Sequence, residues 1–155
     1  MPDRHTESLV MEEAQPDPLA VENRIVIVLD PVLERGAAAN RCAVLATGLA
    51  VHHPEIIGTN LNTADGREIL GFTKVPIAVL AAQDASRLRQ LEDRARELGC
   101  TTLVFLARAQ GLRSYEAYQA SVAQSLSTDL DVDAFIVYGS KKAVNKVTGG
   151  LAALR

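Results

Sequence analysis

The chain has 155 residues, of which 48% are hydrophobic and 23% charged, and its formal net charge is −3. This composition is typical of one soluble domain with a hydrophobic core, and the scarcity of aromatic residues disfavours a nucleic-acid binder that works by base stacking. No apolar run approaches the roughly 20 residues of a membrane span, and residues 1–23 lack a secretory signal, so we expect a cytoplasmic protein with no membrane partner.

Residues 1–23 mix acidic, proline and small polar residues without any periodicity. We interpret them as a mobile acidic tail, with a folded domain over residues 24–155. Met1 and Met11 both serve as a possible start. Because acidic side chains outnumber basic ones in the tail, the rest of the chain is mildly basic, which leaves an RNA partner open without establishing one.

The first element of the folded domain is a β-branched run, RIVIVLD, from Arg24 to Asp30. Such a continuous apolar run predicts a strand that is covered on both faces. A long alanine-rich segment predicts a helix over about 36–53, which Pro54 ends. Residues 54–74 resemble a loop in which an Asp65-Gly66 turn joins two short extended pieces.

Strand and helix patterns then alternate to the end of the chain. The predicted strands are 75–82, 101–109 and 131–139, and the predicted helices are 84–99, 114–126 and a lysine-rich helix from Ser140 onward. Asp84, Ser114 and Ser140 are suitable N-caps, and Gly99 suits a helix end. The order predicts an α/β three-layer sandwich, in which a four-stranded, mostly parallel or mixed sheet has helices on both faces.

The lysine-rich helix is the first candidate site. It follows Gly139 and Ser140, and its first turn holds Lys141 and Lys142, where positive charge opposes the helix dipole. An anion bound nearby would explain that placement, with Gly139, Ser140 and both lysines around it. The alternative is an ordinary solvated helix face. A P-loop spacing is missing, and we expect no cofactor.

A second candidate site is the carboxyl end of the predicted strands, where open α/β sheets bind ligands. Asp30 ends the first strand, Gly36 and Asn40 follow in the next helix, and Arg108 lies near the end of the third strand. Asn40 either faces a ligand or holds the loop carbonyls around Gly36. Arg108 binds an anion, pairs with Asp30, or is a surface arginine at a strand exit.

The remaining reactive residue types give weaker signals. His52 and His53 diverge by roughly 100° on a helix, so they are poor joint ligands for one metal ion. Cys42 and Cys100 lie among apolar or small residues, which predicts inert thiols. Tyr115 and Tyr118 indicate core or interface packing. No Ser/His/Asp or Cys/His arrangement is legible in the sequence.

Two segments together resemble the peptidyl-tRNA hydrolase II family. The ending YGSKKAVNKVTGGL is similar to that family's C-terminal signature, and IVIVLDPVLERGAAANRCA looks like its first strand, acidic turn, glycine and helix. The chain departs from the family at its catalytic positions. The family's lysine after the glycine corresponds to Ala37, and its catalytic aspartate corresponds to Arg108. Losing both groups removes those best suited to polarise an ester and position water.

The chain looks still more like a bacterial domain-of-unknown-function family that shares the peptidyl-tRNA hydrolase II fold. The VLDP strand end, the HPEIIG segment and the YG-x-KKAV-x-KVTG ending carry this resemblance. It implies a homodimer and no established activity. We therefore expect a non-hydrolytic binder of an anionic small ligand, nucleotide or RNA end. The alternatives are a divergent hydrolase of peptidyl-tRNA or a small acyl ester, and a structural or regulatory dimer without a ligand.

Overall fold

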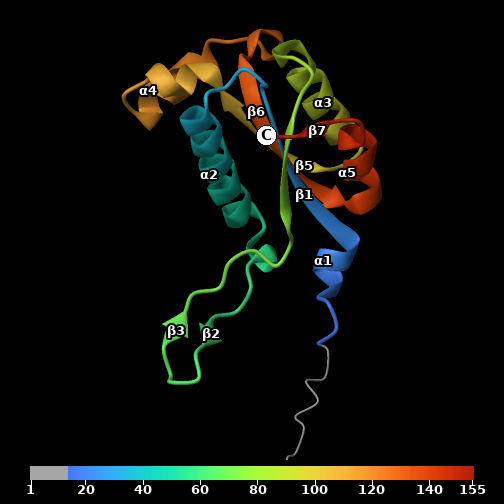
Figure 1. Cartoon of the computed structure of the whole chain (residues 1–155). Helices are drawn as coiled ribbons and strands as arrows, with labels where there is room; N and C mark the ends of the chain where they lie inside the picture. The colour runs from blue at the N-terminus through green and yellow to red at the C-terminus, as the bar shows by residue number, and fades with distance from the viewer. Residues whose placement is uncertain (1–13) are drawn as a thin grey trace, which may run out of the picture.

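The computed structural model describes residues 14–155, which form a mixed α/β structure around one central sheet (Figure 1). The sheet has five strands in the order β5-β6-β1-β4-β7. Their bounds are β1 Asn23–Leu29, β4 Ile77–Ala81, β5 Thr101–Leu106, β6 Val132–Ser140 and β7 Ala152–Ala153. A separate hairpin pairs β2 Leu61–Asn62 with β3 Glu68–Ile69.

The sheet is mixed, and it contains one strand more than the sequence predicted. β1 runs parallel to β4, whereas β6 is antiparallel to both β1 and β5, and β7 is antiparallel to β4. The additional strand β7 is only two residues long and covers the edge of β4 through Leu80 and Ala81. So short a segment shows no alternating pattern, which is why the prediction of four strands was wrong.

Local sequence signals explain where the helices begin. The helices after the first strand are α2 Arg35–His52, α3 Ala85–Glu97, α4 Tyr115–Ala123 and α5 Lys141–Thr148. The predicted caps are confirmed: Asp84, Ser114 and Ser140 each accept a hydrogen bond from a backbone N–H in the first turn of α3, α4 and α5. Gly99 follows α3 with φ +76°, a conformation that glycine adopts without strain.

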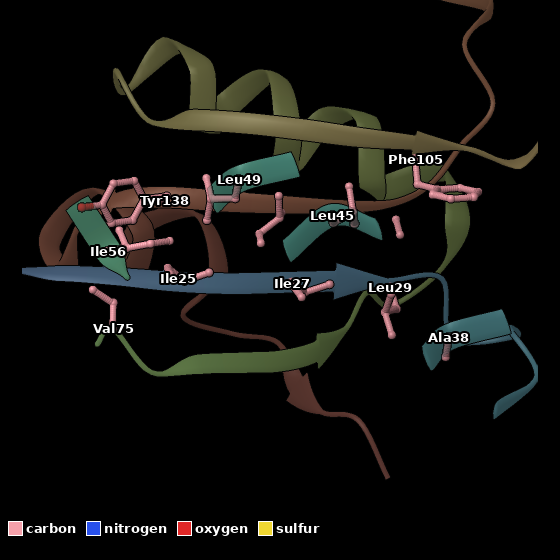
Figure 2. Close-up of a cluster of buried hydrophobic side chains, with 12 residues drawn as sticks. Ile25, Ile27, Leu29, Ala38, Leu45, Leu49, Ile56, Val75, Phe105 and Tyr138 are labelled. Carbon is pink, nitrogen blue, oxygen red and sulfur yellow. The ribbon is translucent and has the colours of Figure 1, made fainter. Parts of the chain in front are cut away.

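The core has two parts, one on each face of the sheet. Ile25, Ile27 and Leu29 of β1 point to the face that α2 covers with Leu45 and Leu49 (Figure 2). Val26 and Val28 point to the opposite face, where α3 contributes Leu88 and α5 contributes Val144 and Val147. This alternation confirms helices on both faces of the sheet and a first strand that is buried on both sides.

The N-terminal segment is more ordered than the sequence predicted. Residues Pro18–Glu22 form a short helix, α1, whose N-cap Asp17 accepts a hydrogen bond from the Leu19 N–H. Leu19 packs against the first core cluster, and the Asp17 carboxylate lies 3.0 Å from Lys74 Nζ. These contacts with distant parts of the chain explain why the predicted tail over 1–23 extended too far. Residues 1–13 of that tail, including Met11, lie outside the described residues.

Residues 57–73 leave the body of the domain as a hairpin that begins after the 3-10 turn Pro54–Ile56 (Figure 1). Its turn contains Gly66 with φ +89°, so the predicted Asp65-Gly66 turn is confirmed. At its base Ile57 bridges Thr73, and the Gly58 N–H donates to the Phe72 carbonyl at 2.9 Å. Within residues 14–155, no helix is long and apolar enough to cross a membrane.

Candidate ligand site at the carboxyl edge of the sheet

One edge of the sheet collects the ends of three strands and the start of a fourth. β4 is parallel to β1, and β5 runs in the same direction as β1 because β6 is antiparallel to both of them. The register places Leu29 beside Ala134, and Leu106 beside Val132. The segments after Leu29 and Leu106 and the segment before Val132 therefore meet at this edge, where open α/β sheets favour ligands.

A buried ion pair lies at this edge and connects α2 to β6. Arg41 Nη2 donates to Asp133 Oδ2 at 2.7 Å, and Arg41 Nε lies 3.3 Å from both carboxylate oxygens. Arg41 is only 2% exposed and Asp133 is 7% exposed. A buried charge of either sign is costly unless it is paired, so the two residues depend on each other.

Two further contacts fix the Arg41 guanidinium. Nη2 also donates to Gln110 Oε1 at 2.8 Å, and the guanidinium carbon lies 4.2 Å from the centre of the Phe105 ring. Within residues 14–155 Nη1 has no hydrogen-bond partner, and no buried side-chain nitrogen there is left unpaired. Nη1 is therefore not completely enclosed by protein, and Arg41 is one of the residues that line the adjacent cavity.

Sequence reasoning missed this pair, although a signal was present. Arg41 shares the buried stripe of α2 with Ala38, Leu45 and Leu49. A single charged residue on an otherwise apolar stripe indicates a buried partner or a site. The partner could not be read from the sequence, because Asp133 is 92 residues away in the chain.

The cavity above Arg41 has a volume of about 540 Å³, and we call it the Arg41 cavity. Its walls come from the start of α2 and from the 3-10 turn Ala107–Gly111, and its lining includes Gly36, Ala37, Asn40 and Gln110. Asn40 is exposed and lines this cavity, so it does not have the buried structural role that we considered. Among residues 14–155, Arg41 is the one charged residue in the lining.

A second cavity of about 430 Å³ adjoins the first between α2 and α4; its lining is largely apolar but includes Arg113 and Ser114. The two cavities share Val44, Phe105 and Ala109. Tyr115 and Tyr118 of α4 close the far side, and we call this hollow the Tyr118 cavity. Burial raises the pKa of the Tyr118 phenol, so this side chain stays neutral at physiological pH.

Asp30 lies in a third hollow on the other side of the Arg41–Asp133 pair. This hollow of about 540 Å³ is lined by Asp30, Asp131 and Asp133 together with Ser86, Arg89 and Gln90. The Asp30 carboxylate accepts a hydrogen bond from the Val32 N–H at 3.1 Å, which stabilises the turn after β1. Asp30 and Asn40 therefore line different cavities and do not converge on one ligand position.

Arg108 pairs with Asp131, and not with Asp30. Its Nε lies 2.6 Å from Asp131 Oδ1, and its Nη1 and Nη2 donate to Ser125 Oγ and to the Asp129 carbonyl. Burial opposes ionisation of Asp131, but hydrogen bonds from Arg108 outweigh it and lower the pKa of the carboxyl. This guanidinium therefore holds the segment between α4 and β6 in place.

The lysines of α5 lie at the opposite edge of the sheet. β6 pairs Ser140 with Asn23, so Gly139, Ser140, Lys141 and Lys142 lie where β1 begins. Lys141 follows Asp133 by eight residues, so at about 3.3 Å per residue along β6 the two lie roughly 25 Å apart. Lys141 lines a smaller hollow of about 230 Å³ that Arg24 also lines. The predicted lysines therefore belong to a separate surface from Asp30 and Asn40.

At that same opposite edge, His53 ties the end of α2 to β5. Its Nδ1 lies 2.8 Å from Glu55 Oε1 and its Nε2 lies 2.8 Å from Thr101 Oγ1. The hydrogen bond from His53 is the main reason that the pKa of Glu55 is lowered. The imidazole also meets the Tyr138 ring edge-on at 4.7 Å. Because His53 is the C-cap of α2, we interpret this cluster as a structural clasp.

Comparison with known proteins identifies relatives without assigning an activity. No curated protein matches the chain. A solved structure, that of the protein of unknown function Atu0240 from Agrobacterium tumefaciens strain C58, is similar with a TM-score of 0.77 at 23% identity. The match covers 85% of this chain and 97% of that one, and it shows a shared fold. Residues 23–155 match the model of a family described as "Protein of unknown function (DUF2000)", and the chain therefore belongs to this family.

Proposed function

We propose that this protein is a non-hydrolytic binder of a small amphipathic anion, which occupies the Arg41 cavity. A carboxylate or phosphate group of the ligand accepts hydrogen bonds from Arg41 Nη1 and the Asn40 amide. The proposal rests on the guanidinium of Arg41, which is almost completely buried, has one nitrogen without a partner among residues 14–155, and belongs to a residue that lines a cavity.

Preorganisation is the physical reason for expecting affinity from this arrangement. Asp133, Gln110 and Phe105 hold the guanidinium in one position, so little side-chain entropy is lost when a ligand binds. The start of α2 adds the positive end of its dipole. Asp133 compensates the charge of Arg41, while no carboxylate of residues 14–155 lines the Arg41 cavity itself. The positive side of the pair therefore faces the ligand.

The rest of the ligand should be apolar. Val44, Phe105 and Ala109 form a continuous wall from the Arg41 cavity into the Tyr118 cavity. Cavities of about 300–1,000 Å³ are typical of sites that bury most of a small molecule, and both hollows are within this range. An anionic group with an aromatic or branched aliphatic body fits this combination better than a highly charged nucleotide or an RNA end.

The alternative of peptidyl-tRNA hydrolysis remains a prediction from the resemblance, and it receives less support from the site. Asp133 and Asp131 are each held by an arginine, so neither carboxylate is placed as a free general base. Ala37 lines the Arg41 cavity where the resembling family has lysine. Release of the peptidyl group from an N-blocked aminoacyl-tRNA, measured beside a genuine hydrolase, tests this alternative. Turnover that disappears in Asp30→Ala would favour the hydrolase.

Binding is tested with simple probes and a pair of charge-matched variants. Phenyl phosphate and phenylacetate are titrated against the protein, with the neutral phenethyl alcohol as the control, by calorimetry and by NMR of the Arg41 Nε signal. Asn40→Asp adds a negative charge at the cavity, and Gln124→Glu adds the same charge at the exposed end of α4. At an effective dielectric constant of about 40–80, two charges roughly 5 Å apart repel by about 1–2 kcal/mol, a factor of about ten in affinity.

We expect both anions to shift the Arg41 Nε signal, Asn40→Asp to weaken them about tenfold, and Gln124→Glu to leave their affinity unchanged. The neutral alcohol should lose little affinity in either variant. Equal weakening of anions and alcohol by Asn40→Asp, or an Arg41 signal that no anion shifts at millimolar concentration, would contradict the proposal.

A further inference from the structure

Aromatic side chains are scarce in this chain, and they are unevenly distributed. The 155 residues include three phenylalanines, three tyrosines and no tryptophan. Phe105, Tyr115 and Tyr118 all line the Tyr118 cavity. The other three lie on the hairpin, in the core on the opposite face of the sheet from α2, and near the end of β6, and they are Phe72, Phe135 and Tyr138. Half of the aromatic residues of the chain therefore line a single cavity.

The hydrophobic core uses only part of the two tyrosines. No residue of α4 is buried, and Tyr115 keeps 69% of its surface. Tyr118 packs against the second core cluster but is only partly buried. The two ring centres lie 6.0 Å apart, a separation typical of aromatic pairs. The two rings therefore form a paired aromatic wall whose remaining surface is available to a bound molecule.

The aromatic surface continues as far as Arg41. Phe105 lines both the Tyr118 cavity and the Arg41 cavity. The centre of its ring lies 4.2 Å from the guanidinium carbon of Arg41. A ligand whose anionic group binds Arg41 therefore has its next atoms beside Phe105 and its far end near the tyrosines. A ring that is joined to the anionic group by a short linker satisfies this arrangement.

The polar residues of the Tyr118 cavity are compatible with such a ligand. Arg113 is exposed, and the Ser114 hydroxyl already accepts a hydrogen bond from the Ala117 N–H at 3.1 Å as the cap of α4. Among residues 14–155, no carboxylate lines this cavity. An anion with an aromatic body therefore meets no like charge in the lining.

We propose that the ligand is an aryl-substituted anion, in which one or two atoms join a carboxylate or phosphate to an aromatic ring, and that Tyr118 selects this ring over a saturated one. The inference rests on the proposed function and narrows it to one class of ligand. An aromatic pair contributes a factor of about two to ten in affinity beyond the burial of its surface. A saturated ring of the same size is at least as hydrophobic, so burial alone would not favour the aromatic ligand.

The first test compares two acids that differ in the ring alone. Phenylacetate and cyclohexylacetate have the same charge and the same number of carbon atoms, and calorimetry measures the Kd of each. Tyr118→Leu removes the ring from the cavity, whereas Tyr118→Phe keeps the ring and removes only the hydroxyl. Phe72→Leu is the matched control, because it removes an aromatic ring from a hairpin residue that is 75% exposed.

We expect the wild-type protein to bind phenylacetate about two- to tenfold more tightly than cyclohexylacetate. Tyr118→Leu should abolish this preference by weakening phenylacetate, while the affinity for cyclohexylacetate stays nearly unchanged. Tyr118→Phe and Phe72→Leu should both keep the wild-type preference. A substitution that merely loosened α4 would weaken both acids by the same factor.

NMR provides a second test that requires no change in the protein that binds the ligand. Nuclear Overhauser effects should connect the ring protons of phenylacetate to those of Tyr118, whose signals are assigned from the spectrum of Tyr118→Phe. Tyr138 is the internal control. It pairs with Ile25 at the start of β1, at the opposite edge of the sheet, and should show no such effect.

Equal or tighter binding of cyclohexylacetate by the wild type would overturn the inference, as would a preference for phenylacetate that survives Tyr118→Leu or ring contacts to Tyr138 in place of Tyr118. If both acids bind equally and both weaken about tenfold in Asn40→Asp, the anion site stands and its aromatic class is refuted. If neither acid binds at millimolar concentration, the proposed function is contradicted as well.

Discussion

The ion pair between Arg41 and Asp133 gives the sharpest test of how this fold is held together. Replacing Arg41 with methionine keeps most of the side-chain volume and removes the charge. Asp133, 7% exposed, would then be an unpaired carboxylate, 2.7 Å from where its partner was. Removing one partner of a buried pair costs about 3–5 kcal/mol, a large fraction of the roughly 5–15 kcal/mol that stabilises a typical domain.

The double variant should recover part of this loss. The variant with both Arg41→Met and Asp133→Asn contains no buried charge. We therefore expect the sum of the losses in free energy of unfolding of the two single variants to exceed the loss of the double variant by at least about 2 kcal/mol. Arg94→Met provides the control, because Arg94 and Glu97 form an exposed pair at 3.5 Å that should contribute less than about 1 kcal/mol. Urea unfolding followed by circular dichroism measures the free energy of unfolding of the wild type, the two single variants, the double variant and the control, provided that the m-values agree. If the losses of the two single variants add up to the loss of the double variant, the two residues are not coupled and the reasoning is wrong.

Three further predictions concern other contacts of the structure. Hydrogen bonds from Arg108 lower the pKa of Asp131. Their contribution to the free energy of unfolding is therefore complete above the ordinary aspartate pKa of about 3.9 and is lost as the pH falls below it. Arg108→Ala should flatten the pH dependence of that free energy in this acidic range. Gly36→Ala should stabilise the protein by about 0.4–1 kcal/mol in urea unfolding, because the added Cβ meets no atom within 4 Å. Gly71→Ala should instead speed hydrogen exchange at the hairpin base, because its Cβ would overlap the Gly58 carbonyl oxygen. Unchanged exchange at Gly58 would contradict this.

The sequence by itself determined the local structure and the layer arrangement. The β-branched run of β1, the caps Ser114 and Ser140, and the turn at Gly66 are encoded within a few residues, so periodicity and capping preferences were enough to locate them. The positions of the helices between strands then predicted that both faces of the sheet are covered. Asn40 is exposed and lines the Arg41 cavity, and its contact with a ligand stays a prediction.

The tertiary structure alone decided which of these elements face one another. Whether a strand runs parallel or antiparallel is not encoded in its own pattern, and the direction of β6 is what places Lys141 and Lys142 roughly 25 Å from Asp133. The pairing of Arg41 with Asp133 joins residues 92 positions apart. Arg108 likewise pairs with Asp131, and not with Asp30. A charged residue on an apolar helix face indicates in the sequence that a buried partner is needed. Only the packing of distant segments determines which residue is that partner.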